Sequence, residues 1–207
     1  YRVIYDIIND IEDAMKGMVD VATKLLQVLT DVVDSIGGLQ TILPMIGAIG
    51  LRVTKIAQAF GCEVLAYSRT VKDIEGIKYV DKETLLKEAD IVSLHTPLTA
   101  ETRGLIGKEE LALMKPSAIL INTARGPVVD SEALALALNE GKIAGAGIDV
   151  CEMEPPVPSN HPLLDAKNVV ATPHVAFATK EALVKRAVIV FANVVKWLNG
   201  EPQNVIK

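Results

Sequence analysis

The chain has 207 residues, of which 50% are apolar, so it is long enough to bury a hydrophobic core. Its formal net charge of −5 excludes the dense basic surface that binding to a nucleic-acid backbone requires. Its two cysteines, Cys62 and Cys151, indicate a reducing compartment, and the sequence has no metal-ligand spacing, signal peptide or bilayer-spanning run. We therefore expect a cytoplasmic protein without membrane contacts.

The first 38 residues differ in character from the rest of the chain. They carry seven acidic and three basic side chains, a net charge of −4, and their apolar residues recur at alternating steps of four and three. This spacing predicts a helix over about residues 10–35 with a broad apolar face, and residues 1–8 are compatible with a short strand. Because such a face must be covered, we expect residues 1–38 to pack on the body of the protein or to drive self-association.

Residues 39–207 form the second predicted unit, which starts beyond a boundary at Gly37-Gly38. After a helical pattern from Leu39 to Gly61, apolar runs typical of strands alternate with helical stretches. This alternation predicts an α/β domain, doubly wound, with a mostly parallel, Rossmann-like sheet and helices on both faces. The predicted strands cover residues 62–67, 91–95, 118–122, 145–150 and 168–172, and the predicted helices cover about 82–89, 108–114, 131–140 and 179–199.

A polar turn follows the predicted strand that contains Ile119. The stretch Ile119–Asp130 runs from a buried strand into a tight turn that carries Arg125, and then starts a helix. In open α/β sheets, ligands bind outside the carboxyl ends of the strands. Arg125 is therefore a candidate functional residue, although an arginine in a solvated turn would show the same local pattern.

Five motifs occur in order between about residue 47 and the end of the chain. They are Ala59–Tyr67, Asp90–Arg103, Ile121–Gly126, Gly145–Val150 with Glu154-Pro155, and Thr172–Ala176. Through these motifs the sequence resembles the coenzyme-binding domain of the NAD(P)-dependent D-2-hydroxyacid dehydrogenases. The resemblance implies a dinucleotide-binding fold and NAD or NADP as the cofactor.

The resemblance also implies a catalytic set of an arginine, a glutamate and a histidine, which fall on Arg125, Glu154 and His174. A guanidinium can bind a substrate carboxylate through two hydrogen bonds and polarise the adjacent carbonyl. A histidine exchanges the hydroxyl proton near neutral pH, and a carboxylate bonded to its other nitrogen fixes its tautomer. Each residue alone could be an ordinary turn or loop residue, but together within these motifs they indicate catalysis.

Further cofactor contacts follow from the same resemblance. Asp149 would meet the nicotinamide carboxamide, and Thr96 and Pro97 would line the adenosine side. The two other histidines, His95 and His161, are expected to be structural or exposed.

The glycine-rich turn departs from the family pattern Gly-x-Gly-x-x-Gly. Met45 stands in place of the first glycine, whereas Gly47 and Gly50 remain. In the family pattern the second glycine lets the backbone approach the pyrophosphate, and the third lets the helix pack closely on the strand. Pro44 lies where the family has its first strand, and proline removes a donor from a central strand. Either that strand is truncated, or the segment is a helix and Tyr1–Ile8 fills the vacant place in the sheet.

The residues after the second strand of the motif are Ser68, Arg69 and Thr70. An acidic residue in this position would bind the ribose hydroxyls of NAD, whereas serine and arginine suit the 2′-phosphate of NADP. An ordinary polar turn explains the same residues almost equally well.

Two functional hypotheses follow from these patterns. Residues 1–38 stand where the family has its substrate domain, and the glycine turn is altered, so we expect a natural or engineered scaffold that is catalytically inactive alone. Such a scaffold would bind a dinucleotide weakly or not at all and would use its helical front end for packing or self-association. The alternative is an NAD(P)-dependent oxidoreductase that reduces 2-keto acids to D-2-hydroxyacids.

Overall fold

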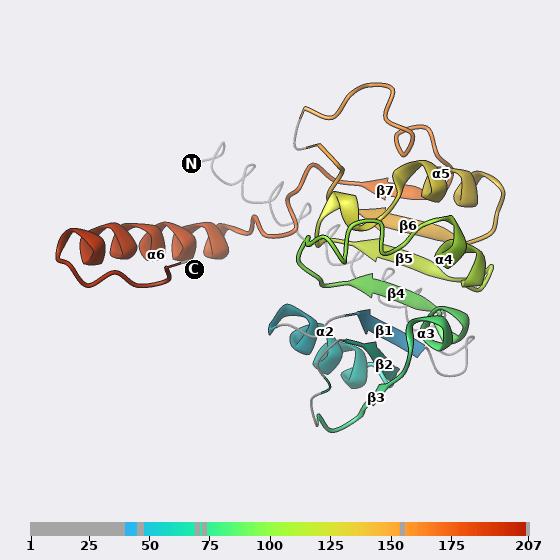
Figure 1. Cartoon of the computed structure of the whole chain (residues 1–207), viewed down its shortest axis with the longest axis horizontal. Coiled ribbons are helices and arrows are strands. Elements are labelled where there is room, and N and C mark those ends of the chain that lie inside the picture. The colour runs from blue at the N-terminus through green and yellow to red at the C-terminus, as the bar shows by residue number, and fades with distance from the viewer. Residues whose placement is uncertain (1–39, 45–47, 69–70, 72–73, 154–155, 206–207) are drawn as a thin grey trace, which may run out of the picture.

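The computed structural model describes residues 40–44, 48–68, 71, 74–153 and 156–205 (Figure 1). The strand expected over residues 1–8, the helix expected over about 10–35 and the boundary at Gly37-Gly38 lie outside the described residues. They therefore stay predictions.

The body of the protein is a parallel sheet of seven strands in the order β3-β2-β1-β4-β5-β6-β7 (Figure 1). The order reverses between β1 and β4, which is the switch point of a doubly wound Rossmann-like fold. The predicted α/β class is confirmed. The strands are β1 (Gln40–Pro44), β2 (Glu63–Tyr67), β3 (Ile77–Tyr79), β4 (Ile91–Leu94), β5 (Ile119–Asn122), β6 (Gly145–Ile148) and β7 (Val169–Ala171).

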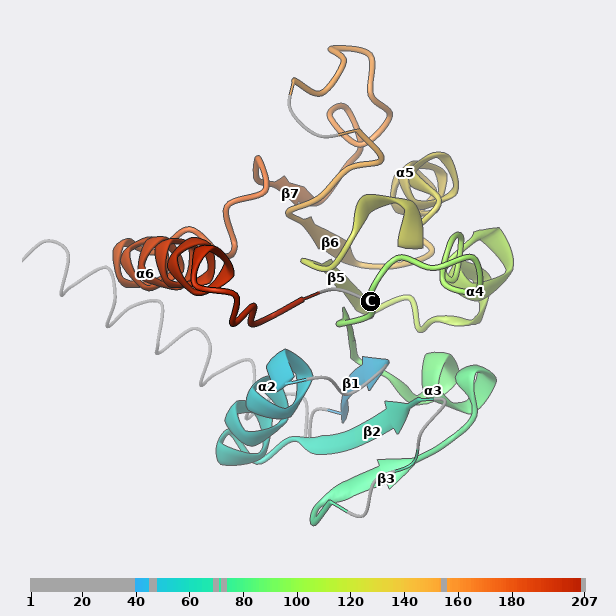
Figure 2. The same ribbon diagram turned by 60° about the vertical axis from the view of Figure 1, so that its left-hand side comes forward.

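Helices cover both faces of this sheet. Figure 2 shows α3, α4 and α5 along one face and α2 on the other, where α2 lies against β1 and β2. Side-chain caps start two of these helices, because Asp81 accepts the N–H of Thr84 and Asp130 accepts the N–H of Ala133. The helical segments are α2 (Ala48–Ala59), α3 (Lys82–Glu88), α4 (Lys108–Leu113), the 3₁₀ turn η1 (Gly126–Val128), α5 (Ser131–Asn139) and α6 (Lys180–Leu198).

The hydrophobic core lies between the sheet and α3, α4 and α5. Leu86, Val92, Leu120 and Leu134 are fully buried there, with Leu138 2% exposed. These side chains come from the apolar runs that predicted strands and from the inner stripes of the predicted helices. The core therefore fixes β4 and β5, whose carboxyl ends reach the candidate site.

The segment around Pro44 is a strand and not a helix. β1 pairs with β2 through all five of its residues and with β4 through Thr41 and Ile42, so it occupies the centre of the sheet. The hypothesis that this segment turns helical and leaves its place to residues 1–8 is wrong, and α2 begins only at Ala48. Pro44 is tolerated because it is the last strand residue, beyond the pairing with β4, where a missing N–H disturbs the ladder least.

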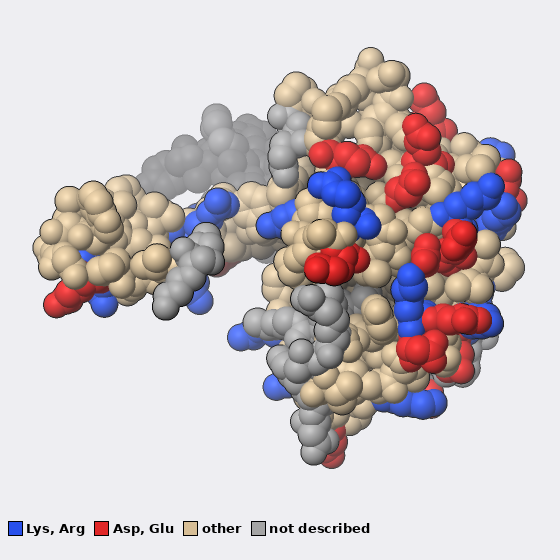
Figure 3. All heavy atoms as spheres, in the orientation of Figure 1, with Lys and Arg blue, Asp and Glu red and all other residues tan. Residues whose placement is uncertain are grey.

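Helix α6 projects away from the sheet (Figure 1) and none of its 19 residues is buried. Its surface in Figure 3 is largely uncharged, with Phe191 71% and Trp197 68% exposed. Even so, the described part of the chain contains no helix with the length and apolar character needed to span a bilayer. Apolar side chains thus form much of the exposed surface of α6.

Among the described glycines, Gly126 has the closest backbone neighbour. A Cβ atom at this position would lie 1.9 Å from the carbonyl oxygen of Cys151, whereas a Cβ atom at Gly50 would meet only His95 at 3.6 Å. We therefore expect Gly126→Ala to lower the free energy of unfolding by at least about 1–3 kcal/mol, because backbone must move to make room. Gly50→Ala, the control within a helix, should be neutral or stabilising by up to about 1 kcal/mol.

Urea unfolding followed by circular dichroism measures both changes. Equal midpoints for Gly126→Ala and the wild-type protein would contradict the close approach at this point.

Candidate active site

The predicted catalytic arginine and histidine line one cavity. It has a volume of about 580 Å³ and lies at the carboxyl ends of β5, β6 and β7, where the fold is expected to bind ligands. Arg125 enters it from the turn after β5, Asp149 from the end of β6 and His174 from the turn after β7. The other lining residues are Ile49, Thr123, Pro173, Ala176, Phe177 and Arg186.

The turn that presents Arg125 is closed by the side chain of Asn122. Its amide nitrogen donates to the carbonyl of Arg125 at 3.0 Å, and its amide oxygen accepts the N–H of Ala124 at 3.0 Å. Asn122 is 1% exposed, so both bonds form away from water. Asn122 was not among the predicted site residues, although asparagine at a strand end followed by a turn is typical of this local bonding.

Asp149 holds the turn that carries His174. Its Oδ1 accepts the hydroxyl of Thr172 at 2.6 Å and the N–H of Val175 at 2.8 Å, and its Oδ2 accepts the N–H of Ala176 at 2.9 Å. The backbone carbonyl of Asp149 accepts the N–H of His174 at 2.8 Å. A carboxylate offers about four acceptor sites. Asp149 can therefore organise this turn and still accept one further donor, such as the expected carboxamide.

These contacts set the charge of Asp149. Burial acts to raise the pKa of its carboxyl group, but the hydroxyl of Thr172, the two backbone N–H groups and the nearby His174 outweigh it. The pKa of Asp149 is therefore lower than that of an ordinary aspartate, which keeps the carboxylate charged.

His174 is half-buried and has a positive φ of 56°, a backbone conformation that non-glycine residues adopt at some cost. Its ring meets the ring of Phe177 edge to face, with 5.5 Å between the centroids. The ring of Phe177 also contacts Arg186, whose guanidinium carbon lies 5.3 Å from the ring centroid. The histidine thus belongs to a small group of packed side chains rather than to a freely moving loop.

Glu154, the predicted third catalytic residue, lies outside the described residues. The nearby acid Glu152 is already engaged, because its Oε2 lies 2.9 Å from Nε2 of His161. Burial acts to raise the pKa of Glu152, but hydrogen bonds from Ser131 and His161 lower it on balance. His161 is 9% exposed, and this pairing agrees with the structural role expected for it.

The predicted adenosine-side residues line a neighbouring hollow of about 320 Å³. Thr96 and Pro97 lie there together with His95, and Ile49 and Arg125 border both this hollow and the first cavity. Nε2 of His95 lies 3.0 Å from the hydroxyl oxygen of Ser93, and burial lowers the pKa of His95, which favours the neutral imidazole. The two hollows together form a trough that leads from Thr96 to His174.

The amino end of α2 faces this trough through Ile49, and no acidic residue lies in its first turn. Exposed N–H groups at a helix start attract phosphates, so the trough fits a dinucleotide. Gly50 lies in the first turn of α2, and Ser68 directly follows β2. Gly47 and Arg69 lie outside the described residues, and within the described ones no three His, Cys, Asp or Glu side chains are grouped as metal ligands.

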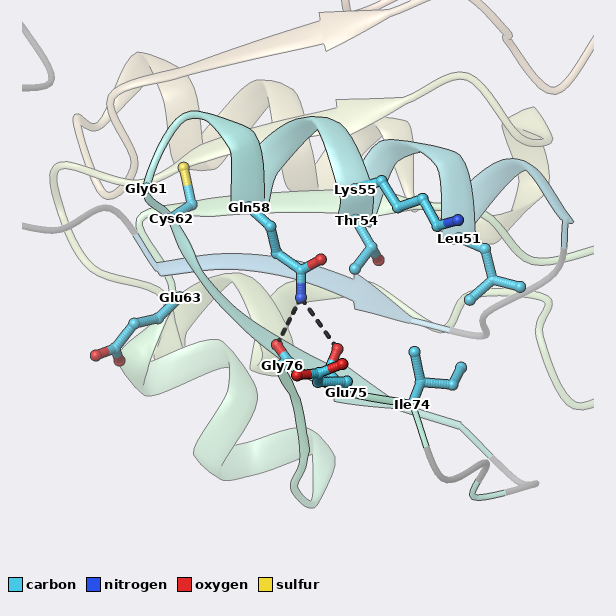
Figure 4. Close-up of a pocket in the computed structure, with 10 residues that line it drawn as sticks. All are labelled: Leu51, Thr54, Lys55, Gln58, Gly61, Cys62, Glu63, Ile74, Glu75 and Gly76. Carbon is cyan, nitrogen blue, oxygen red and sulfur yellow. Dashed lines mark hydrogen bonds between the residues drawn. The ribbon is translucent and has the colours of Figure 1, made fainter.

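A further hollow of about 690 Å³ lies between α2 and the segment that leads into β3 (Figure 4). Gln58 of α2 spans it, donating to the carbonyls of Glu75 at 3.3 Å and Gly76 at 3.0 Å. Only residues 68–76 separate β2 from β3, fewer than the dozen or more that a helical crossover needs. The connection is therefore too short for a crossover helix beside this hollow, and neither Arg125 nor His174 lines it.

Comparison with known proteins identifies relatives that match most of the chain. Residues 31–176 match the family described as D-isomer specific 2-hydroxyacid dehydrogenase, NAD binding domain. The glyoxylate reductase of Thermococcus litoralis is 52% identical over 165 residues, which cover 77% of this chain and 49% of that protein.

Solved structures agree with these sequence matches. The TT0316 protein from Thermus thermophilus has 45% identity and a TM-score of 0.76, covering 81% of this chain and 53% of that one. The NAD-complexed D-isomer specific 2-hydroxyacid dehydrogenase from Lactobacillus delbrueckii ssp. bulgaricus has 38% identity and a TM-score of 0.72, covering 80% and 54%. The chain thus spans about half the length of these relatives.

The hypothesis of a catalytically inactive scaffold, remodelled or engineered at its front end, is wrong. The relative that shares 52% of the compared residues is a named glyoxylate reductase, and the family match begins at residue 31, upstream of Gly37-Gly38. The match therefore includes the altered turn at Met45. A relative of this fold binds NAD, so weak or lost cofactor binding has no support.

The contacts of Asp149 predict an acid-dependent stability. A carboxylate with a lowered pKa in the folded state stabilises the fold above its unfolded pKa of about 3.9, and this contribution is lost as the pH falls through the folded value. Asp149→Asn should therefore lower the free energy of unfolding by about 1–3 kcal/mol at neutral pH, since one oxygen is replaced by a donor that faces a donor.

The difference from the wild-type protein should shrink as the pH falls to about 3 in urea titrations. Asp165→Asn makes the same change of charge at an exposed site and should have little effect. A constant deficit for Asp149→Asn across this pH range would contradict the role of its charge.

Proposed function

Because the chain belongs to the D-isomer specific 2-hydroxyacid dehydrogenase family, we propose that it acts as an NAD(P)-dependent oxidoreductase in which the described domain binds the coenzyme. The proposed reaction reduces 2-keto acids to D-2-hydroxyacids. The observation that carries this proposal is the shared cavity of Arg125 and His174, which brings a carboxylate-binding group and a proton donor to one place.

The two residues have complementary tasks in such a reduction. The guanidinium of Arg125 binds the substrate carboxylate through two hydrogen bonds and draws electron density from the neighbouring keto oxygen. Protonated His174 delivers a proton to that oxygen as it becomes a hydroxyl. When bound, the reduced nicotinamide supplies the hydride that reaches the keto carbon, so one hydride and one proton complete the alcohol.

We propose that Glu154 assists His174 by accepting a hydrogen bond from its imidazole, which would raise the basicity of the ring and fix its orientation. The engagement of Glu152 with His161 supports this assignment, because it leaves Glu154 as the nearby acid of the motif for the task.

For the cofactor, Gly47 and Gly50 would allow the pyrophosphate to approach the start of α2, with Thr96 and Pro97 on the adenosine side. Asp149 would accept the carboxamide of the nicotinamide. Ser68 and Arg69 favour a 2′-phosphate and hence NADP, whereas NAD is the cofactor present in a solved relative. Both cofactors therefore belong in any assay.

Activity is tested by following the oxidation of NADH and of NADPH with glyoxylate and hydroxypyruvate. We expect turnover by the wild-type chain and a loss of roughly 10²- to 10⁴-fold in kcat for His174→Asn, which removes the proton donor. Arg125→Lys should mainly raise KM, because the two-pronged contact with the carboxylate is lost.

Arg103→Lys is the matched control, since Arg103 is exposed and lies outside both hollows. Unchanged kinetics in His174→Asn, or no turnover by the wild-type chain with either cofactor, would count against the proposed function.

We further propose that copies of the chain associate through apolar helical surface. The face expected on residues 10–35 motivates this proposal, and the exposed apolar side chains of α6 add to it. Light scattering should give a mass above that of one chain, and Phe191→Asp should reduce it. Val71→Asp, at an exposed apolar side chain away from α6, is the control, and a monomeric wild-type protein would exclude the proposal.

A further inference from the structure

Arg186 brings a second guanidinium into the cavity of Arg125 and His174. It belongs to α6, the helix that otherwise projects from the body, and it lines the same cavity of about 580 Å³. Its guanidinium carbon lies 5.3 Å from the centroid of Phe177, whose ring in turn meets His174 at 5.5 Å. Arg186 is thus placed by an aromatic contact one side chain away from the proposed proton donor.

The described residues that line this cavity include two exposed guanidinium groups and one carboxylate. Asp149 is the acid among its lining residues, and three donors already bind that carboxylate. Among the described residues, no carboxylate forms an ion pair with Arg125 or with Arg186. Both guanidinium groups are exposed, so water screens their repulsion, and an anion that enters the cavity would be attracted by both.

A simple 2-keto acid supplies a single carboxylate, and one guanidinium binds a carboxylate fully through its two-pronged contact. The second guanidinium therefore has no partner on such a substrate. The guanidinium carbon of Arg186 lies 5.3 Å from the centroid of Phe177, and a guanidinium has five N–H donors with which it can bind a second anion.

We propose that Arg186 is a specificity-determining residue that binds a second anionic group, carboxylate or phosphate, on the far end of the 2-keto acid. The proposal rests on the proposed function, because Arg125 and His174 must act on the keto acid end of the same molecule. It assigns the preferred substrates to short-chain 2-keto acids that carry a second anionic group, which a cavity of this size accommodates.

Matched substrates test this assignment. 2-Oxoglutarate and 2-oxopentanoate have the same chain length but differ in the second carboxylate, and 3-phosphohydroxypyruvate and hydroxypyruvate differ in a phosphate. In at least one pair, we expect the wild-type protein to have a higher kcat/KM for the substrate that carries the second anionic group than for the substrate that lacks it. The pair that shows it identifies the anion.

Substitution of Arg186 should abolish this preference. In each pair, kcat/KM for the substrate with the second anionic group is divided by kcat/KM for the substrate without it. In Arg186→Met this ratio should fall roughly 10- to 100-fold, as expected for the loss of a charge-assisted hydrogen bond. Arg186→Lys should recover part of the ratio. Lys185→Met removes the same charge from the neighbouring residue, which does not line the cavity, and should leave the ratio unchanged.

The outcomes separate this proposal from the proposed function. If Arg186→Met lowers activity on both members of a pair equally, Arg186 only positions Phe177 and the proposal is overturned. If the wild-type chain reduces none of the substrates, the proposed function fails, and calorimetric binding of 2-oxoglutarate and 2-oxopentanoate still decides the role of Arg186. Tighter binding of the dianion that is lost in Arg186→Met supports it, and equal binding of the two overturns it.

Discussion

The carboxylate of Asp149 makes the contacts on which the geometry of this site depends. It lies directly after β6 and accepts donors from Thr172, Val175 and Ala176 in the turn after β7. A buried carboxylate is stable only when hydrogen bonds replace its lost water. The same three bonds that satisfy the charge therefore fix the turn, and with it the position of His174 between them.

The other side of the site is fixed by backbone packing. Asn122 closes the turn after β5 on the carbonyl of Arg125, and Gly126 lies against the carbonyl of Cys151, which follows the end of β6. Polar bonds and close contact thus tie the ends of β5, β6 and β7 to one another. Arg125 and His174, distant in the sequence, face one cavity because their turns share β6 and its extension as a common support.

Most of the sheet and its helices could be predicted from the sequence, because long apolar runs and capped helices carry strong local signals. The predicted strand over 118–122 and helix over 131–140 correspond to β5 and α5 within a residue or two. β3 was not predicted because it has only three residues and lies at the edge of the sheet. Pro44 wrongly suggested a helix, because its place at the end of β1 depends on pairing with strands that are distant in the sequence. Family motifs located Arg125 and His174, whereas Phe177 and Arg186 become site residues only through the path of the chain into α6.

The error about function had a physical source as well. Met45 and Pro44 suggested an inactive protein because each departs from a local expectation. Met45 replaces the first glycine of the turn, and Pro44 lies in a strand at the position where a backbone donor is expected. Neither irregularity removes the contacts that shape the cavity, since Asn122, Gly126 and Asp149 all lie downstream and are mutually supported. A site built from several strand ends tolerates change in one turn as long as the others keep their bonds. Substrate preference can then shift through residues at the margin, such as Arg186 on its aromatic support, without disturbing the groups that exchange the proton and bind the carboxylate.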